Sequence, residues 1–306
     1  MVVASWSPTL YEPSDVSPEP PMPPGPPGPP IRLWRRRALT LGGALPLSGV
    51  LAACGGPGTD PAPAVPTTAV PSDIEPRLLA LLDDAPRCVM AVEETQGPYW
   101  FDVDSIRRDI REDRPGLELH LALRVQDARN CDPDGGAPGV ANAVVEIWHC
   151  DAGGVYSGYE DSSVAASGGT GAPGGASSIV TMSDGSYSLD DGQIPTTDDG
   201  TYLRGAQVTD GNGIAQFTTI FPGWYTGRTV HIHLKVHIDR RTVLTTQLYL
   251  DDALTDDIFA GVAPYTAHPG RDTRNDTDVI FHATGLVNTA REPDRILAAI
   301  NLGIDI

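Results

Sequence analysis

Residues 117–125 read LELHLALRV, and this stretch decides the fold. Its odd-numbered positions are all leucine or valine, whereas the positions between them are Glu, His, Ala and Arg. Because successive side chains of a β-strand point to opposite faces of a sheet, the alternation predicts a strand with one buried face. Further apolar or alternating runs predict strands at residues 143–148, 185–189, 215–220, 229–238, 243–250 and 296–304.

Turns rich in glycine and aspartate separate these runs, for example at residues 132–139 and 210–213. Such residues tolerate the tight backbone conformations of hairpin loops. Seven or so strands with no helical pattern between them predict an all-β fold, an antiparallel β-sandwich with long loops. A short helix is expected at residues 76–82, and the Gly/Ser-rich residues 167–178 predict a mobile surface loop.

The chain ahead of the sandwich has a different composition. Residues 1–54 form a Pro-rich tail and an export signal: Arg35, Arg36 and Arg37 precede a short apolar run that ends at Cys54. This order is typical of a bacterial lipoprotein signal, and the paired arginines indicate twin-arginine export. Residues 55–75 predict a disordered Gly/Pro-rich linker, and residues 76–306 the sandwich domain. Whether residues 1–21 are translated stays open, because Met22 is an alternative start.

We therefore expect an exported protein, either a lipoprotein anchored through Cys54 at the cell surface or in a periplasm-like space, or a secreted one. With Cys54 assigned to lipid, Cys88, Cys131 and Cys150 allow three disulfide pairings. We favour Cys88–Cys131, because Cys150 follows an apolar strand and can be a buried small side chain. The other two pairings stay open.

Charge argues against nucleic acid as a partner. The chain has 21 Lys and Arg against 40 Asp and Glu, a net charge of −19. Such an acidic surface repels phosphate backbones. No apolar run is long enough to cross a bilayer, so we expect no membrane-spanning helix.

Two histidines mark the candidate site. His231 and His233 occupy alternate positions of a predicted strand, which places them on one face about 7 Å apart, within reach of one metal ion. His237 shares that face but lies further along the strand, and we interpret it as structural. Upstream, residues 221–228 (FPGWYTGR) form a turn that brings Tyr225 and Arg228 towards the same place.

Five ordered motifs together identify a family resemblance. They are EETQGPY at 93–99, VEIW at 145–148 closing on GVY at 154–156, PGWY at 222–225, RTVHIH at 228–233 and TQLY at 246–249. This set resembles the intradiol ring-cleavage dioxygenases, the protocatechuate 3,4-dioxygenase and catechol 1,2-dioxygenase superfamily. With the export signal, it is most similar to the exported, actinobacterial-type branch.

The resemblance implies a mononuclear Fe(III) held by four side chains, Tyr156, Tyr225, His231 and His233. It implies catalytic roles for three residues: Tyr225 is displaced by the catechol and takes up a proton, Arg228 stabilises negative charge, and Gln247 lies behind the metal ligands. The implied reaction is intradiol cleavage of a catechol-type aromatic by O2 to a cis,cis-muconate-type product. Which catechol is cleaved and how many subunits assemble stay open.

Two other functions compete with this one. The same strands could form a non-catalytic transthyretin-like binding module, or a copper or zinc sandwich enzyme that also uses His-x-His. The two tyrosines together with the two histidines favour the dioxygenase.

The remaining polar and aromatic residues receive weaker interpretations. We expect Trp148 and Trp224 to pack around the site, Tyr99 and Tyr159 to be candidates for its lining, and His149 to be exposed or hydrogen-bonded. The acidic cluster at residues 251–257 predicts a solvated face.

Overall fold

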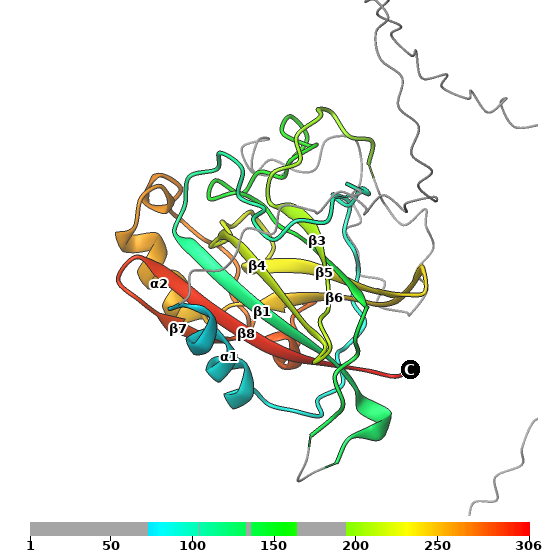
Figure 1. Ribbon diagram of the computed structural model, residues 1–306. Helices are drawn as coiled ribbons and strands as arrows, with labels where there is room; N and C mark the ends of the chain where they lie inside the picture. Colours follow the sequence, from blue (N-terminus) through cyan, green and yellow to red (C-terminus); the bar gives the residue numbers. More distant parts are fainter. Residues whose placement is uncertain (1–72, 104, 133–135, 164–193) are drawn as a thin grey trace, which may run out of the picture. The chain divides into compact units, whose positions relative to one another are not determined.

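The computed structural model describes residues 73–306 apart from 104, 133–135 and 164–193. The predicted tail, export signal and most of the linker lie outside these residues, as do the strand expected at 185–189 and the loop expected at 167–178. Two four-stranded sheets pack face to face (Figure 1), so the all-β sandwich is confirmed.

Sheet A has the strand order β4-β1-β8-β7, and sheet B has the order β3-β2-β5-β6. The strands of sheet A are β4 (Ile214–Ile220), β1 (Glu118–Asp127), β8 (Arg295–Ile304) and β7 (Asn288–Arg291). Those of sheet B are β3 (Arg204–Val208), β2 (Val144–Trp148), β5 (His231–Ile238) and β6 (Arg241–Tyr249). All neighbours are antiparallel except β1 and β8, which run parallel.

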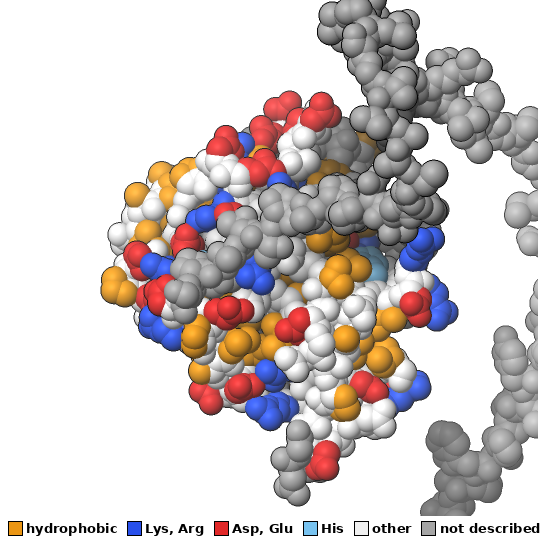
Figure 2. Space-filling view, in the orientation of Figure 1, with side chains coloured by type: hydrophobic (Ala, Val, Ile, Leu, Met, Phe, Trp, Pro, Cys, Tyr) orange, Lys and Arg blue, Asp and Glu red, His pale blue; other side chains and the backbone are white. Residues whose placement is uncertain are grey.

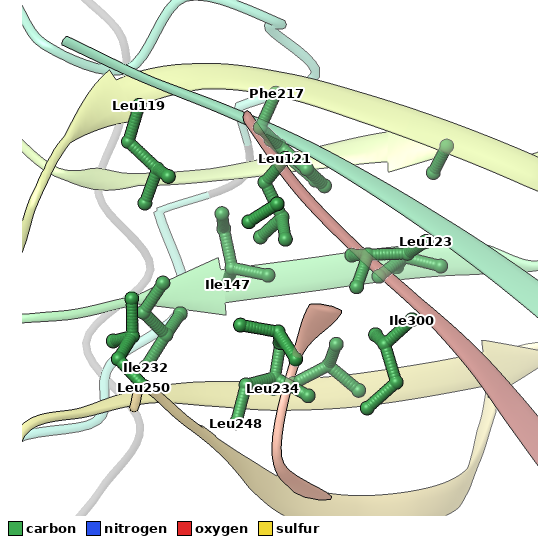
Figure 3. Close-up of a cluster of buried hydrophobic side chains, with 14 of the residues drawn as sticks. Leu119, Leu121, Leu123, Ile147, Phe217, Ile232, Leu234, Leu248, Leu250 and Ile300 are labelled. Carbon is green, nitrogen blue, oxygen red and sulfur yellow. The ribbon is translucent and has the colours of Figure 1, made fainter. Parts of the chain in front are cut away.

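The core lies between the sheets (Figure 3). Leu119, Leu121 and Leu123 of β1 face Ile147 of β2 and Leu234 of β5, and all five side chains are fully buried. Each contributes about 1.5–3 kcal/mol to folding. Because alternate residues of β5 point into this core, the residues between them point outward from sheet B. The predicted metal ligands of β5 therefore lie on the outer face of sheet B and not inside the sandwich.

Helix α1 (Glu75–Asp84) covers part of the outer face of sheet A (Figure 1). Its Leu78 and Leu82 are fully buried against Ala122 of β1 and Leu297 of β8. This is the short helix expected at 76–82, slightly extended at both ends. Among the described residues, no helix is both long and apolar enough to cross a membrane.

A second helix, α2 (Asp252–Gly261), contradicts the expectation that no helical segment interrupts the strands. The acidic cluster at 251–257 is part of it. Asp251 caps the helix by accepting a hydrogen bond from the Leu254 backbone N–H at 2.8 Å, and Asp252 and Asp256 both pair with Arg271. A cap and ion pairs thus stabilise a helix where the composition suggested only a solvated face.

Short 3-10 turns complete the described elements: η1 (Ala128–Asn130), η2 (Tyr265–Ala267) and η3 (Ala283–Gly285). A disulfide joins Cys88 to Cys131, and Cys150 is a buried free thiol, so the favoured pairing is confirmed. On the face shown in Figure 2, basic side chains are scattered among acidic ones and form no continuous stripe.

Candidate active site

Four side chains converge on the outer face of sheet B. The Tyr225 hydroxyl lies 3.1 Å from Nε2 of His231, and the Tyr156 hydroxyl lies 3.4 Å from the same nitrogen. Nε2 of His233 lies 3.1 Å from Nε2 of His231. All four residues are at most 7% exposed. The structure therefore brings together every side chain predicted to hold the metal.

A backbone carbonyl fixes the tautomer of His231. Its Nδ1 lies 2.6 Å from the carbonyl oxygen of Thr229. Because a carbonyl can only accept, Nδ1 carries the proton and Nε2 presents its lone pair to the other three side chains. Burial lowers the pKa of His231 to about 3 and also lowers that of His233. Both imidazoles are thus neutral, the form that binds a metal.

Packing holds His233 in place. Its ring stacks on Trp148 with centroids 4.9 Å apart and planes within 4°. Gly97 lies on it so closely that a Cβ there would come 3.1 Å from Cε1 of the imidazole, and Gly97 has a φ of +71°. Among the described residues, Nδ1 of His233 has no hydrogen-bond partner. The stacking of Trp148 on His233 makes Trp148 a packing residue of the site, as expected.

The two tyrosines differ in how tightly they are held. Tyr156 is fully buried, stacks on Tyr99 with centroids 4.7 Å apart, and its backbone N–H donates to the Ser163 hydroxyl. Tyr225 is the first residue of a tight turn inside the predicted segment 221–228. The Arg228 N–H donates to the Tyr225 carbonyl oxygen, and Gly227 adopts a φ of +86°. The turn thus places Tyr225 and Arg228 beside the histidines.

The donor set fits a hard cation. Burial raises the pKa of both Tyr156 and Tyr225, so the phenols stay protonated unless a positive charge is bound beside them. Within the described part of the chain, no group of three or more His, Cys, Asp or Glu side chains could hold a metal. A metal ion at this place would therefore need the phenol oxygens as well as the two imidazoles.

Arg228 is anchored on both sides. Its Nε donates to Oδ2 of Asp278 at 2.9 Å, and its Nη2 donates to Oε1 of Gln247 at 2.5 Å. The amide nitrogen of Gln247 in turn donates to the Thr95 carbonyl at 3.0 Å. Burial alone would raise the pKa of Asp278, but Arg228 and two backbone N–H groups bring it below its usual value. Arg228 and Gln247 thus contact each other, and Gln247 lies opposite His233 in the sheet.

Comparison with known proteins agrees with this geometry. Residues 96–276, more than half of the chain, match the family model described as Dioxygenase. The chain belongs to the intradiol ring-cleavage dioxygenase family.

Two relatives illustrate the similarity. The chain is 31% identical over 199 residues to a chlorocatechol 1,2-dioxygenase of Pseudomonas sp. (strain P51), a match that spans 57% of this chain and 62% of that relative. It thus covers less than two thirds of the relative's length. The solved intradiol ring-cleavage dioxygenase from Tetranychus urticae is 28% identical, with a TM-score of 0.57 over 71% of this chain and 95% of that one.

Two acidic residues of this dioxygenase-family site were not predicted. Asp278 lies in a loop without a recognisable motif, so no sequence pattern could have indicated it. Glu94 lies within the motif at 93–99, but no role was assigned to it. Its carboxylate accepts the Tyr249 hydroxyl at 2.7 Å, and burial raises its pKa to about 7.

Two of the other aromatic candidates, Tyr99 and Tyr159, belong to the same buried cluster as Tyr156 and Tyr225. Tyr99 contacts Tyr156, and Tyr159 is fully buried with its ring 5.3 Å from that of Tyr99. Trp224 was expected to pack around the site but belongs to the main core cluster; its ring stacks on His268 and its Nε1 donates to the His268 carbonyl. Of the two alternatives expected for His149, the structure shows the hydrogen-bonded one: the side chain is fully buried, and its ring nitrogens bond to the Cys150 carbonyl and the Thr219 hydroxyl. His237 lies outside the cluster, and its Nε2 lies 3.3 Å from the Glu146 carboxylate.

Proposed function

We propose that this chain is an Fe(III)-dependent intradiol dioxygenase that cleaves a catechol-type aromatic with O2 to a cis,cis-muconate-type product. The convergence of Tyr156, Tyr225, His231 and His233 on one point carries this proposal. Phenolate oxygens are hard anionic donors that favour ferric over ferrous iron. Bound there, ferric iron would supply Lewis-acid activation of the catechol.

Tyr225 is the residue suited to exchange with the substrate. It lies at the start of a turn whose next two residues, Thr226 and Gly227, are exposed. Tyr156 has no such freedom, because it is fully buried and packed on Tyr99. We infer that the Tyr225 hydroxyl oxygen takes up a proton from the catechol, while Tyr156 stays in place.

Arg228 supplies fixed positive charge to the substrate. Asp278 and Gln247 occupy its Nε and Nη2, whereas Nη1 has no hydrogen-bond partner among the described residues. A guanidinium held in this way needs no rearrangement when negative charge develops on the ring. Gln247 orients this group and does not touch the substrate in our scheme.

An iron analysis, a visible spectrum and an oxygen-uptake assay test the proposal on one preparation. We expect iron near one per chain, a red-brown phenolate-to-iron absorption band, and equal consumption of O2 and of one member of a small catechol panel, with muconate absorbance. A colourless protein that takes up no O2 would overturn it and favour the transthyretin-like binding module. Bound copper without the band would favour the sandwich enzyme of the other metal class.

We also propose that the domain works outside the cytoplasm, with a lipid anchor at Cys54. The Cys88–Cys131 disulfide supports this location, because such bonds persist in oxidising compartments. Replacing both Arg36 and Arg37 by lysine should leave precursor in the cytoplasm, and Cys54→Ala should release active domain from the membrane. Export that survives the double arginine change would contradict a twin-arginine route.

A further inference from the structure

A row of four side chains crosses the outer face of sheet B at the level of His233. The register pairs Gln247 of β6 with His233, His233 with Trp148 of β2, and Trp148 with Arg204 of β3. Directly opposed residues of antiparallel strands lie on the same face of a sheet. Arg204 therefore lies on the metal-site side of the sheet, next to the indole on which His233 stacks.

The guanidinium of Arg204 clamps the backbone beside Tyr156. Its Nε donates to the Ser157 hydroxyl and its Nη2 to the Ser157 carbonyl, both at 2.8 Å. The Ser157 hydroxyl itself donates to the Tyr202 carbonyl at 2.6 Å. Ser157 directly follows Tyr156, so these bonds fix one side of the turn that carries the phenol.

Unlike Arg228, Arg204 forms no ion pair with a carboxylate among the described residues, and the carboxylate of Glu146 acts on its charge only through space. Arg204 is 1% exposed, and its Nη1 is buried without a hydrogen-bond partner among the described residues. The rings of Phe101 and Tyr159 lie 4.3 and 5.7 Å from its Cζ, which gives it cation–π contacts in place of a direct ion pair. Burying an unpaired charge is costly, so a fold that keeps one gains from any negative charge that forms nearby.

The charge of Arg204 persists at neutral pH, although burial lowers its pKa to about 10. The phenols of Tyr159 and Tyr156 are the groups that most oppose this lowering. Of these two, Tyr156 is the one that would become a phenolate on binding iron. The Tyr159 hydroxyl instead donates to the Trp100 carbonyl.

We propose that Arg204 is a positioning residue for the Tyr156 ligand: it holds the turn through Ser157, and its unpaired charge stabilises the Tyr156 phenolate. This inference rests on the iron site proposed above. It assigns a function to a side chain that touches neither the metal-binding atoms nor the substrate.

Absorption spectra and iron affinities of Arg204 variants test it. Removing a positive charge near a phenolate raises the energy of its electrons, so Arg204→Met should move the phenolate-to-iron band to longer wavelength. Competition with nitrilotriacetate should show ferric iron bound about tenfold more weakly. Arg204→Lys keeps a cation, and its band should stay close to the wild-type position.

Arg107→Gln is the matched control. Arg107 donates to the Arg204 carbonyl from outside the site and pairs with Glu112, so its loss affects the same strand without changing the charge beside Tyr156. An unshifted band and unchanged affinity in Arg204→Met would overturn the proposal. An equal shift in Arg107→Gln would also overturn it, since a general loosening of β3 would then explain both.

Two further outcomes are distinct. If Arg204→Met does not fold, Ser157→Ala replaces it: with the cation still present, iron should bind more weakly at an unchanged band position, and unchanged affinity would overturn the clamp. If wild-type protein loaded with ferric iron shows no phenolate band, the proposed iron site is wrong, and the proposed role of Arg204 is wrong as well. An unshifted Arg204→Met band beside a normal wild-type band removes Arg204 alone.

Discussion

At the scale of single residues, the four donors of the site depend on one another. Nε2 of His231 contacts Tyr156, Tyr225 and His233, so the loss of any one side chain leaves the others around a gap. Tyr156→Phe, His231→Ala or His233→Ala should therefore strip or greatly weaken the proposed ferric site. Iron content and band intensity measure this effect, and thermal stability should fall with the iron, because a ligand of the folded state alone stabilises it.

His237→Ala is the control for these variants. His237 is on the same strand and face, but its ring lies beside Glu146 and not among the donors. It should keep full iron and colour. A full-intensity band in Tyr156→Phe, or lost iron in His237→Ala, would show that the assignment is wrong.

Arg228 has two separable effects. Arg228→Leu should lower turnover per bound iron by about 10²–10³, the usual cost of removing one preorganised charge-stabilising group. It should also lower stability by roughly 3–5 kcal/mol, because Asp278 is left buried without its ion pair.

The double variant Arg228→Leu/Asp278→Asn separates these effects. Removing the stranded carboxylate should restore much of the thermal stability while turnover per iron stays low. Turnover per iron close to wild type in either variant would reduce Arg228 to a structural ion pair.

At the scale of elements, residues 89–101 form a closing segment, which covers the site on the outer face of sheet B. The Glu94 N–H donates to the Thr245 carbonyl, Thr95 accepts from Gln247, and Gly97 lies on His233. This segment has no regular secondary structure, and no strand pattern predicted its course. Only its motif indicated its importance.

Glu94 gives this segment a pH dependence. Its pKa of about 7 in the folded protein exceeds the ordinary 4.5, so the folded state holds the proton more tightly. The resulting stability is complete below about pH 4.5 and is lost as the pH rises through 7. The free energy of unfolding should fall by roughly 3 kcal/mol over this range relative to Glu94→Gln. Denaturant titrations at several pH values measure the difference, with the exposed Asp161→Asn as control; parallel curves for wild type and Glu94→Gln would contradict it.

Strands with strong apolar alternation were predicted from sequence, and weakly patterned ones were not. β1, β2, β4, β5, β6 and β8 all carry such patterns. β3 reads RGAQV and β7 reads NTAR, so neither has an alternation to detect, and both owe their place to pairing with a neighbour. Helix α2 was not predicted because a run of acidic residues is also typical of a loop. The ion pair with Arg271 and the Asp251 cap, which stabilise the helix, are contacts that the sequence pattern does not show.

The residues of the site follow the same division. The side chains that could be predicted are those in motifs on or beside β5, where strand geometry fixes their direction. Asp278 and the clamp of Arg204 on Ser157 join parts of the chain that are far apart in sequence. Only the three-dimensional arrangement shows these contacts.

At the scale of the whole domain, the disulfide holds the start of the closing segment. Cys88 directly precedes residues 89–101, and its bond to Cys131 closes a loop with a sequence separation of 43. Constraint of the unfolded chain by a loop of this size is worth about 2–4 kcal/mol. Reduction should lower the free energy of unfolding by that amount and loosen iron retention.

Denaturant titrations with and without reductant measure this contribution. The Cys88→Ser/Cys131→Ser variant should have the same free energy of unfolding as wild-type protein with a reduced disulfide, and reductant should not change it. A wild-type midpoint that reductant leaves unchanged would contradict a stabilising role for the bond.

The parallel pairing of β1 with β8 determines when the fold can form. Glu118 lies opposite Arg295, and nearly the whole site is encoded between these two residues. Because β8 lies between β1 and β7, sheet A is split until β8 has been synthesised, and β1 cannot bury its second edge earlier. Contacts so distant in sequence make folding slow. The predicted ligands on sheet B therefore acquire a stable support only late in the synthesis of the chain, and we expect iron to bind the proposed site only after β8, which contributes none of these ligands, has been completed.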